Sequence, residues 1–120
     1  MNRNVVKRMM TFDVIAKIPG KKDALGNTQY QTVECKGYPV DDILTIYDNL
    51  GKMVTSSMQL YVTGDDGLKI PSTAILNVGN YVTNGDEKNF VPLYENKPII
   101  KRQIYYKPFG KVDVGVFYMP

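Results

Sequence analysis

Hydrophobic and polar positions alternate most clearly near the end of the chain, in residues 111–118. Every second residue there is apolar, and these residues would share one face of an extended chain: Val112, Val114, Val116 and Tyr118. Lys111 and Asp113 would point the other way. The pattern predicts a half-buried strand.

Three earlier segments show the same alternation. Residues 11–18 place Phe12, Val14, Ala16 and Ile18 on one face, and Pro19-Gly20, which interrupt ladders, should end this strand. After a polar loop at 21–28, residues 29–36 should turn Val33 and Cys35 inward. Residues 57–63 should bury Met58, Leu60 and Val62, and Gly64-Asp65-Asp66-Gly67 should follow as a turn.

The C-terminal third predicts a hairpin. Residues 89–94 form a short candidate strand, and residues 99–107 form a longer one in which neither face is purely apolar. Such a strand is suited to contact a partner. The short link Pro108-Phe109-Gly110 predicts antiparallel pairing of this strand with the last one.

Residues 39–56 fit two structures. Asp41 could cap a short helix that ends at Gly51. Alternatively, residues 43–47 and 52–55 contain β-formers and flank Asp48-Asn49-Leu50-Gly51, which suits a tight connection. We favour the hairpin.

These patterns predict a mainly β fold, a small antiparallel β-barrel or sandwich with extended hairpin loops. A chain of 120 residues fits one domain spanning 1–120, and no repeat or linker divides it. Apolar residues make up 43% and charged residues 22%, far from the composition of disordered chains. We therefore expect one folded, β-barrel-like unit.

Location and compartment follow from what the sequence does not contain. No apolar run approaches the roughly 18 residues of a membrane span, so we expect a soluble protein without membrane contact. Residues 1–8 carry positive charge without an apolar stretch after them, which does not support a secretory signal. The single cysteine, Cys35, cannot form an internal disulfide, and we expect it to be buried as an apolar residue.

The sequence contains no motif that indicates a catalytic site. The chain has no histidine, the side chain most often used as a general base near neutral pH. The acidic pairs Asp41-Asp42, Asp65-Asp66 and Asp86-Glu87 lie in turn-like settings and are interpreted as solvated. Residues 64–69 lack the spacing of a phosphate-binding loop. We expect no enzyme, no cofactor, no metal and no small-molecule substrate.

The aromatic residues leave two functions open. Tyr105 and Tyr106, beside Lys101, Arg102 and Lys107, could stack on the bases of single-stranded nucleic acid. The same residues also suit the core and subunit contacts of a β protein, where tyrosine is enriched. The net charge of +3 is too small to name a nucleic-acid partner.

The order of segments from Gln31 to Asn80 carries a family resemblance. A strand-like segment at 31–38 precedes the D-x-x-G turn Asp48–Gly51, then small polar residues and the aliphatic-Tyr-aliphatic run Leu60-Tyr61-Val62. A turn then leads into residues 68–70, and residues 75–82 would form the next strand. Residues 11–30, with a polar tip at 23–27, complete the pattern as an opening hairpin. The chain thereby resembles the head-closure, or head-completion, proteins at the neck of tailed bacteriophages; residues 97–107 have no counterpart.

The resemblance implies a structural virion protein assembled in the host cytoplasm. Its subunits would form a dodecameric ring below the portal and adaptor, seal the DNA-filled capsid and offer a docking surface to tail proteins. Loops would reach toward the channel through which DNA passes, and strand edges would pair between subunits. The loops expected at the channel or between subunits contain Asp48, Asn49, Leu50, Gly51, Lys52, Gly64, Asp65, Asp66, Gly67 and Lys69.

Two alternatives stay open. A tail-joining or tail-terminator subunit would share the β content but bind tail-tube proteins. A single-stranded nucleic-acid-binding barrel would use Lys101, Arg102, Tyr105 and Tyr106, and its binding would weaken steeply with salt.

Overall fold

The computed structural model describes residues 8–120, and nearly all of its regular structure is β-strand. Its strands are β1 (Phe12–Lys22), β2 (Thr28–Val40), β3 (Leu44–Tyr47), β4 (Met53–Ser56), β5 (Met58–Thr63), β6 (Ile75–Asn84), β7 (Glu87–Pro98), β8 (Lys101–Tyr106) and β9 (Val112–Met119). A short helix, α2 (Gly64–Lys69), follows β5, and a 3₁₀ turn at Pro108–Gly110 joins β8 to β9. The predicted mainly β class is confirmed.

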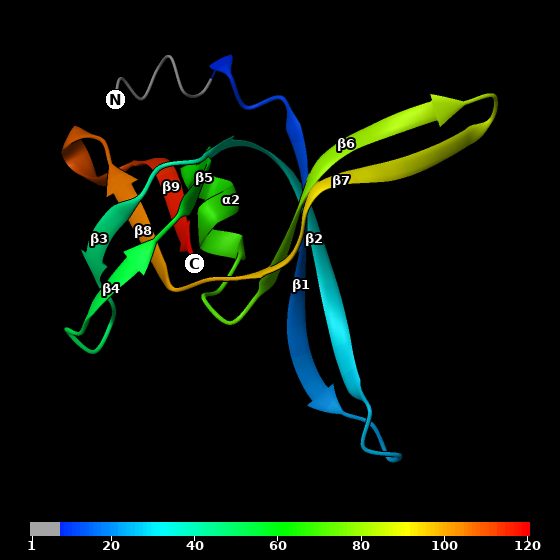
Figure 1. Cartoon of the computed structure of the whole chain (residues 1–120), viewed down its shortest axis with the longest axis horizontal. Coiled ribbons are helices and arrows are strands. Elements are labelled where there is room, and N and C mark those ends of the chain that lie inside the picture. The colour runs from blue at the N-terminus through cyan, green and yellow to red at the C-terminus, as the bar shows by residue number, and fades with distance from the viewer. Residues whose placement is uncertain (1–7) are drawn as a thin grey trace.

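Seven strands form one antiparallel sheet in the order β7-β6-β1-β2-β5-β9-β8, and β3 and β4 form a separate two-stranded sheet (Figure 1). The edge strands β7 and β8 are consecutive in the chain, separated only by Ile99 and Ile100. Because so few residues span only about 10 Å, the sheet must curl until its two edges approach each other. No ladder joins β7 to β8 in residues 8–120, so the fold is barrel-like without a closed ring of strands.

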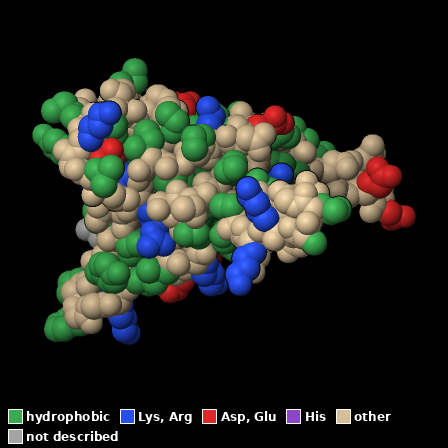
Figure 2. Space-filling view, turned by 90° about the horizontal axis from the view of Figure 1, so that it is seen from below, with side chains coloured by type: hydrophobic (Ala, Val, Ile, Leu, Met, Phe, Trp, Pro, Cys, Tyr) green, Lys and Arg blue, Asp and Glu red, His purple; other side chains and the backbone are tan. Residues whose placement is uncertain are grey.

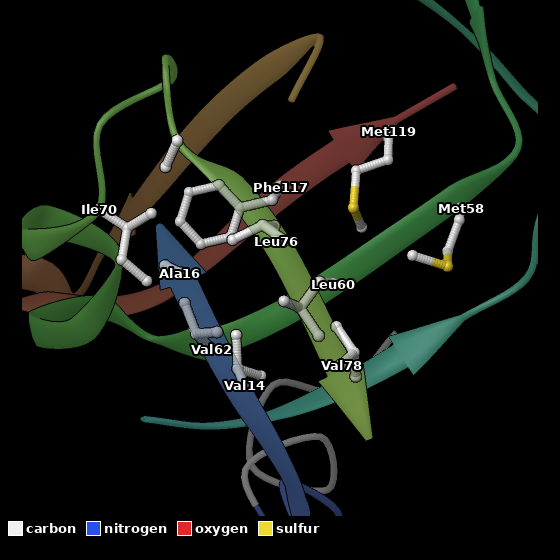
Figure 3. Close-up of a cluster of buried hydrophobic side chains, with 11 residues drawn as sticks. Val14, Ala16, Met58, Leu60, Val62, Ile70, Leu76, Val78, Phe117 and Met119 are labelled. Carbon is white, nitrogen blue, oxygen red and sulfur yellow. The ribbon is translucent and has the colours of Figure 1, made fainter. Parts of the chain in front are cut away.

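The core fills the inside of the curled sheet (Figure 3). Strands β1 and β6 supply side chains from one side and β5 and β9 from the other: Val14, Ala16, Leu76 and Val78, then Met58, Leu60, Val62, Phe117 and Met119. Ile70 and Ala74, from the segment after α2, complete the cluster. The inward faces predicted for residues 11–18 and 57–63 are confirmed.

Strand β9 is buried on both faces, so the prediction of a half-buried strand is wrong. Phe117 and Met119 enter the core, while Val114 and Val116 lie on the opposite face with Met10. Three partly buried tyrosines cover that second face: Tyr38, Tyr61 and Tyr118. The strand therefore lies between two apolar layers.

Residues 64–69 form helix α2, and the turn predicted there is wrong. The Thr63 hydroxyl caps the helix by accepting a hydrogen bond from the Asp66 backbone N–H at 3.3 Å, and it donates to the Asp66 carboxylate at 2.9 Å. Gly64 and Gly67 allow the helix to lie directly on β9; a Cβ at Gly67 would stand 3.2 Å from the Cα of Gly115. The Thr-x-x-Asp spacing is the sequence signal that was missed.

Residues 41–56 form the β3–β4 hairpin, so the hairpin is confirmed and the helix excluded. Two buried polar side chains at its base attach it to the main sheet. The Ser56 hydroxyl donates to the carbonyl of Met119 at 2.8 Å, and the Gln59 amide donates to Ser56 and to the carbonyl of Asp42. The distal part of the hairpin is exposed.

Two other hairpins, β1–β2 and β6–β7, extend as long arms beyond the body of the molecule (Figure 1). Strand β1 continues through Pro19-Gly20 to Lys22, so the predicted end at Pro19 is wrong. Strand β1 pairs with β6 only as far as Lys17. Beyond that residue the β6 side of β1 is a free edge, so the backbone N–H that Pro19 does not have is not needed for pairing there. The strand predicted at 89–94 is likewise part of a longer one, β7.

Two sequence predictions concern burial and location. Cys35 is only partly buried, against the core, and this burial, with a smaller effect of Asp66, raises the pKa of its thiol to about 12. Within residues 8–120, no helix is long and apolar enough to cross a membrane. The prediction that the N-terminus holds no secretory signal concerns residues 1–8, of which 1–7 lie outside the described part.

Candidate interaction surfaces

Three hairpin tips share one five-residue frame that exposes an apolar side chain. The frames are residues 23–27, 48–52 and 107–111. In each, the backbone N–H of the first residue donates to the carbonyl of the fifth, and the N–H of the fourth donates to the carbonyl of the first. The fourth residue is always a glycine with positive φ: Gly26, Gly51 and Gly110.

The third residue of each frame is Leu25, Leu50 or Phe109, with 86%, 93% and 103% of its surface exposed. In the first two frames an aspartate, Asp23 or Asp48, holds the turn: its carboxylate accepts hydrogen bonds from the backbone N–H groups two and four residues later, at 2.9–3.0 Å. Ordered turns thus present single apolar residues to solvent, where each is available to contact a partner. We define these three frames as the hairpin tips.

Phe109 adopts a backbone conformation that bulky residues rarely hold. Its φ is 72° and its ψ 18°, in the left-handed region that favours glycine. Such strain usually persists where the surrounding structure imposes it and where the residue has a role. Because Phe109 makes no buried contact in the isolated chain, its role should lie outside the chain.

Lysines flank the tips. Lys21 and Lys22 precede the first frame, Lys52 ends the second, and Lys107 and Lys111 begin and end the third. All five side chains are exposed. The fourth hairpin turn, between β6 and β7, carries Asp86 and Glu87, and Lys88 follows them.

Of the two candidate loops predicted from the sequence, one is an exposed turn in the structure and the other is a helix. Residues Asp48–Lys52 form an exposed hairpin tip, as an interaction loop requires. Residues Gly64–Lys69 form α2, whose glycines are buried against β9, so this segment is not a free loop. Asp65, Leu68 and Lys69 remain on its exposed side.

The predicted cluster of Lys101, Arg102, Tyr105 and Tyr106 is divided between the two faces of β8. Successive residues of a strand point to opposite faces, which separates Lys101 and Tyr105 from Arg102 and Tyr106. Tyr105 lies at the second apolar face. There, burial and a hydrogen bond with Tyr105 raise the pKa of the Tyr118 phenol.

Arg102 binds the end of helix α2. Its Nη1 donates to the carbonyls of Gly67 at 3.2 Å and Ile70 at 3.1 Å, which satisfies groups that a helix terminus leaves unpaired. The guanidinium is thus occupied within the chain and supports the fold. This removes one of the four residues on which the nucleic-acid hypothesis depends.

We expect Arg102→Ala to lower the free energy of unfolding by about 1.5–3 kcal/mol, the usual loss for hydrogen bonds to a charged group. Arg102→Lys keeps the charge but has no rigid, planar guanidinium to hold one donor nitrogen between the two carbonyls, so it should restore only part of the stability. Urea unfolding of the three proteins measures this. A stable Arg102→Ala protein would show that the contact with α2 contributes nothing.

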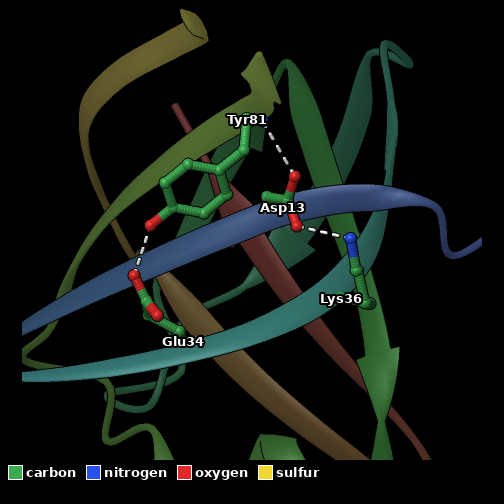
Figure 4. Close-up of polar contacts among 4 residues, drawn as sticks. All are labelled: Asp13, Glu34, Lys36 and Tyr81. Atoms are coloured by element: carbon green, nitrogen blue, oxygen red, sulfur yellow. Dashed lines mark hydrogen bonds and ion pairs between the residues drawn. The ribbon is translucent and has the colours of Figure 1, made fainter. Parts of the chain in front are cut away.

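A polar network at the base of the β6–β7 arm was not predicted (Figure 4). Asp13 accepts a hydrogen bond from Lys36 Nζ at 2.5 Å and another from the Tyr81 backbone N–H at 3.0 Å. The Tyr81 phenol donates to the Glu34 carboxylate. The network connects β6, β1 and β2 just beyond Gly79, the last residue of β6 that pairs with β1.

The same residues line a shallow depression of about 280 Å³, together with Lys88, whose Nζ lies 4.4 Å from the centre of the Tyr81 ring. Partial desolvation raises the pKa of Asp13, but the hydrogen bonds from Lys36 and Tyr81, together with the charges of Lys36 and Lys88, lower that pKa by more. Each charged group thus has a partner at the depression. We interpret the network as a support for the arm, not as a binding site.

The described residues, 8–120, contain no group of three or more His, Cys, Asp or Glu side chains that could hold a metal ion. Comparisons of the chain with models of protein families, with curated proteins and with solved structures found no match. The hairpin tips are therefore the main basis for a functional proposal.

Proposed function

We propose that this chain is a structural subunit of the neck of a tailed bacteriophage, of the head-closure type. It works by binding other proteins: copies of itself in a ring, the portal and adaptor above, and tail proteins below. Genomic DNA passes through the ring without being held. In this proposal the protein has no catalytic role and takes no cofactor.

The observation that carries the proposal is the set of three hairpin tips. Each tip belongs to a different hairpin, and each exposes one large apolar side chain on an ordered turn. Anchor residues that fill pockets on a partner account for much of the binding energy at protein interfaces. Several anchors on separate hairpins fit a subunit that contacts more than one neighbour.

The fold supports the same proposal. The curled antiparallel sheet with long hairpins agrees with the fold that the resemblance to head-closure proteins implies. Nucleic-acid binding loses support, since Arg102 contacts α2 and Tyr105 and Tyr106 lie on opposite faces of β8. A tail-joining subunit would have the same tips and differs only in the proteins that it binds.

We expect Leu25→Ser, Leu50→Ser and Phe109→Ser to leave the stability unchanged, because none of the three side chains is buried. A replacement at a tip that contacts the portal–adaptor complex should weaken binding about tenfold, or about 1.4 kcal/mol. Leu68→Ser, at an exposed leucine of α2 outside the tips, is the matched control.

Co-sedimentation with isolated portal–adaptor complexes and with tail-tube proteins measures the effect and separates head closure from tail joining. If all three tip variants bound both partners as tightly as the unaltered chain, the tips would not be the binding elements.

A further inference from the structure

The β6–β7 arm has one face that is apolar and acidic. Val82 and Val91 are half exposed, at 50% and 53%. They share this face, because Val91 pairs with Asn80 and residues 80 and 82 point the same way. Glu87 pairs with Asn84 and lies on this face too, and Asp86 stands in the adjoining turn.

The only cation of residues 80–91 lies on the other face. Lys88 pairs with Thr83 and stands over the Tyr81 ring. The Tyr81 ring in turn contacts the Phe90 ring edge to face, with centroids 5.3 Å apart. Val82, Val91, Asp86 and Glu87 are named here the acidic arm face. Within residues 80–91, this face has two carboxylates and no positive charge.

The tip at residues 107–111 has the opposite chemistry. Lys107 and Lys111 are joined by a backbone hydrogen bond of 2.6 Å and stand on either side of Phe109. The other two tips begin with an aspartate, whereas this one contains no carboxylate. Residues 107–111 are named here the basic tip.

The two surfaces lie at opposite ends of the molecule (Figure 1). In Figure 2, acidic side chains gather at the end where Figure 1 places the β6–β7 turn. A basic tip therefore cannot reach the acidic arm face of its own chain, but it can reach that of another copy. Because two different surfaces meet, a pair of copies retains one free basic tip and one free acidic arm face, and the contact can propagate from copy to copy.

We infer that the basic tip of one copy docks on the acidic arm face of the next. Phe109 lies against Val82 and Val91, and Lys107 and Lys111 lie beside Asp86 and Glu87. The inference rests on the proposed ring-forming function and names the surfaces that join its subunits. A contact of this size is small, so association in solution should be weak and should decrease as salt screens the charges.

A charge exchange tests the inference with the full chain. The variants are Lys107→Glu/Lys111→Glu, Asp86→Lys/Glu87→Lys, and the fourfold combination. Each double variant sets like charges against each other and should sediment as a monomer at concentrations where the unaltered chain associates. An equimolar mixture of the two double variants, and the fourfold variant alone, should associate again.

Phe109→Ser should weaken the association about tenfold, and Leu68→Ser, at an exposed leucine outside the tips, should leave it unchanged. Sedimentation velocity over a concentration series gives each result. The inference is overturned if the unaltered chain stays monomeric throughout, if the double variants associate normally, or if neither charge exchange restores association. Binding to portal–adaptor complexes is measured separately, so these surfaces can fail while the proposed function stands.

Discussion

Replacing Phe117 by alanine is expected to lower the free energy of unfolding by about 3–5 kcal/mol. Phe117 has no exposed surface and lies on β9 between Leu60 of β5 and Arg102 of β8. Its ring fills the space where the two halves of the curled sheet meet. Domains of this size are stable by only about 5–15 kcal/mol, so the loss should be a large part of the total.

Phe109→Ala makes the same chemical change at a fully exposed position. It should alter the stability by no more than about 0.5 kcal/mol. Urea unfolding of the unaltered chain and both variants gives the comparison. Equal losses for the two variants would contradict the assignment of Phe117 to the core and Phe109 to a solvent-exposed tip.

Gly79→Ala is expected to destabilise the base of the β6–β7 arm by about 1–3 kcal/mol or more. A Cβ at this position would lie 2.1 Å from the carbonyl oxygen of Val91 and 2.8 Å from the Cα of Pro92. Both obstacles are backbone atoms, so β6 and β7 would have to separate. The pairing register already shifts here, between Val78 and Gly79.

Amide hydrogen exchange should show lost protection in β6 and β7 of the Gly79→Ala protein, with less change in β5 and β9. Gly85→Asn is the matched control at the tip of the same arm. Gly85 has a φ of 65°, which asparagine tolerates, and no atom lies within 4 Å of its added Cβ. An unchanged exchange pattern in Gly79→Ala would mean that the arm is not packed as described.

The sequence predicted the strand faces that supply the core with alternate residues. Val14 and Ala16 on β1, and Leu60 and Val62 on β5, follow the period-two pattern because each strand turns these residues to the core. Strand β9 breaks this rule. Phe117 and Met119 enter the core on one face, while Val114 and Val116 on the other face pack with Met10, so its two faces are covered by different layers.

The helix α2 and the tip motif were missed for local reasons. Gly64 and Gly67 disfavour a helix by propensity, but the approach to β9 requires residues without a Cβ, and Arg102 satisfies carbonyls at the helix end. The shared tip frame was visible in part as Asp-x-Leu-Gly at 23–26 and 48–51. The third tip, Lys-Pro-Phe-Gly, shares only the apolar residue and the glycine, and its backbone hydrogen bonds are needed to relate it to the others.

The proposed function is that this chain binds neck proteins and does not hold nucleic acid. The most direct measurement is sedimentation of the purified chain with isolated portal–adaptor complexes and, in parallel, with a single-stranded oligonucleotide over a series of salt concentrations. The proposed function predicts defined co-sedimentation with the portal complex and none with the oligonucleotide. Oligonucleotide binding that weakens steeply with salt, without binding to the portal complex, would contradict it.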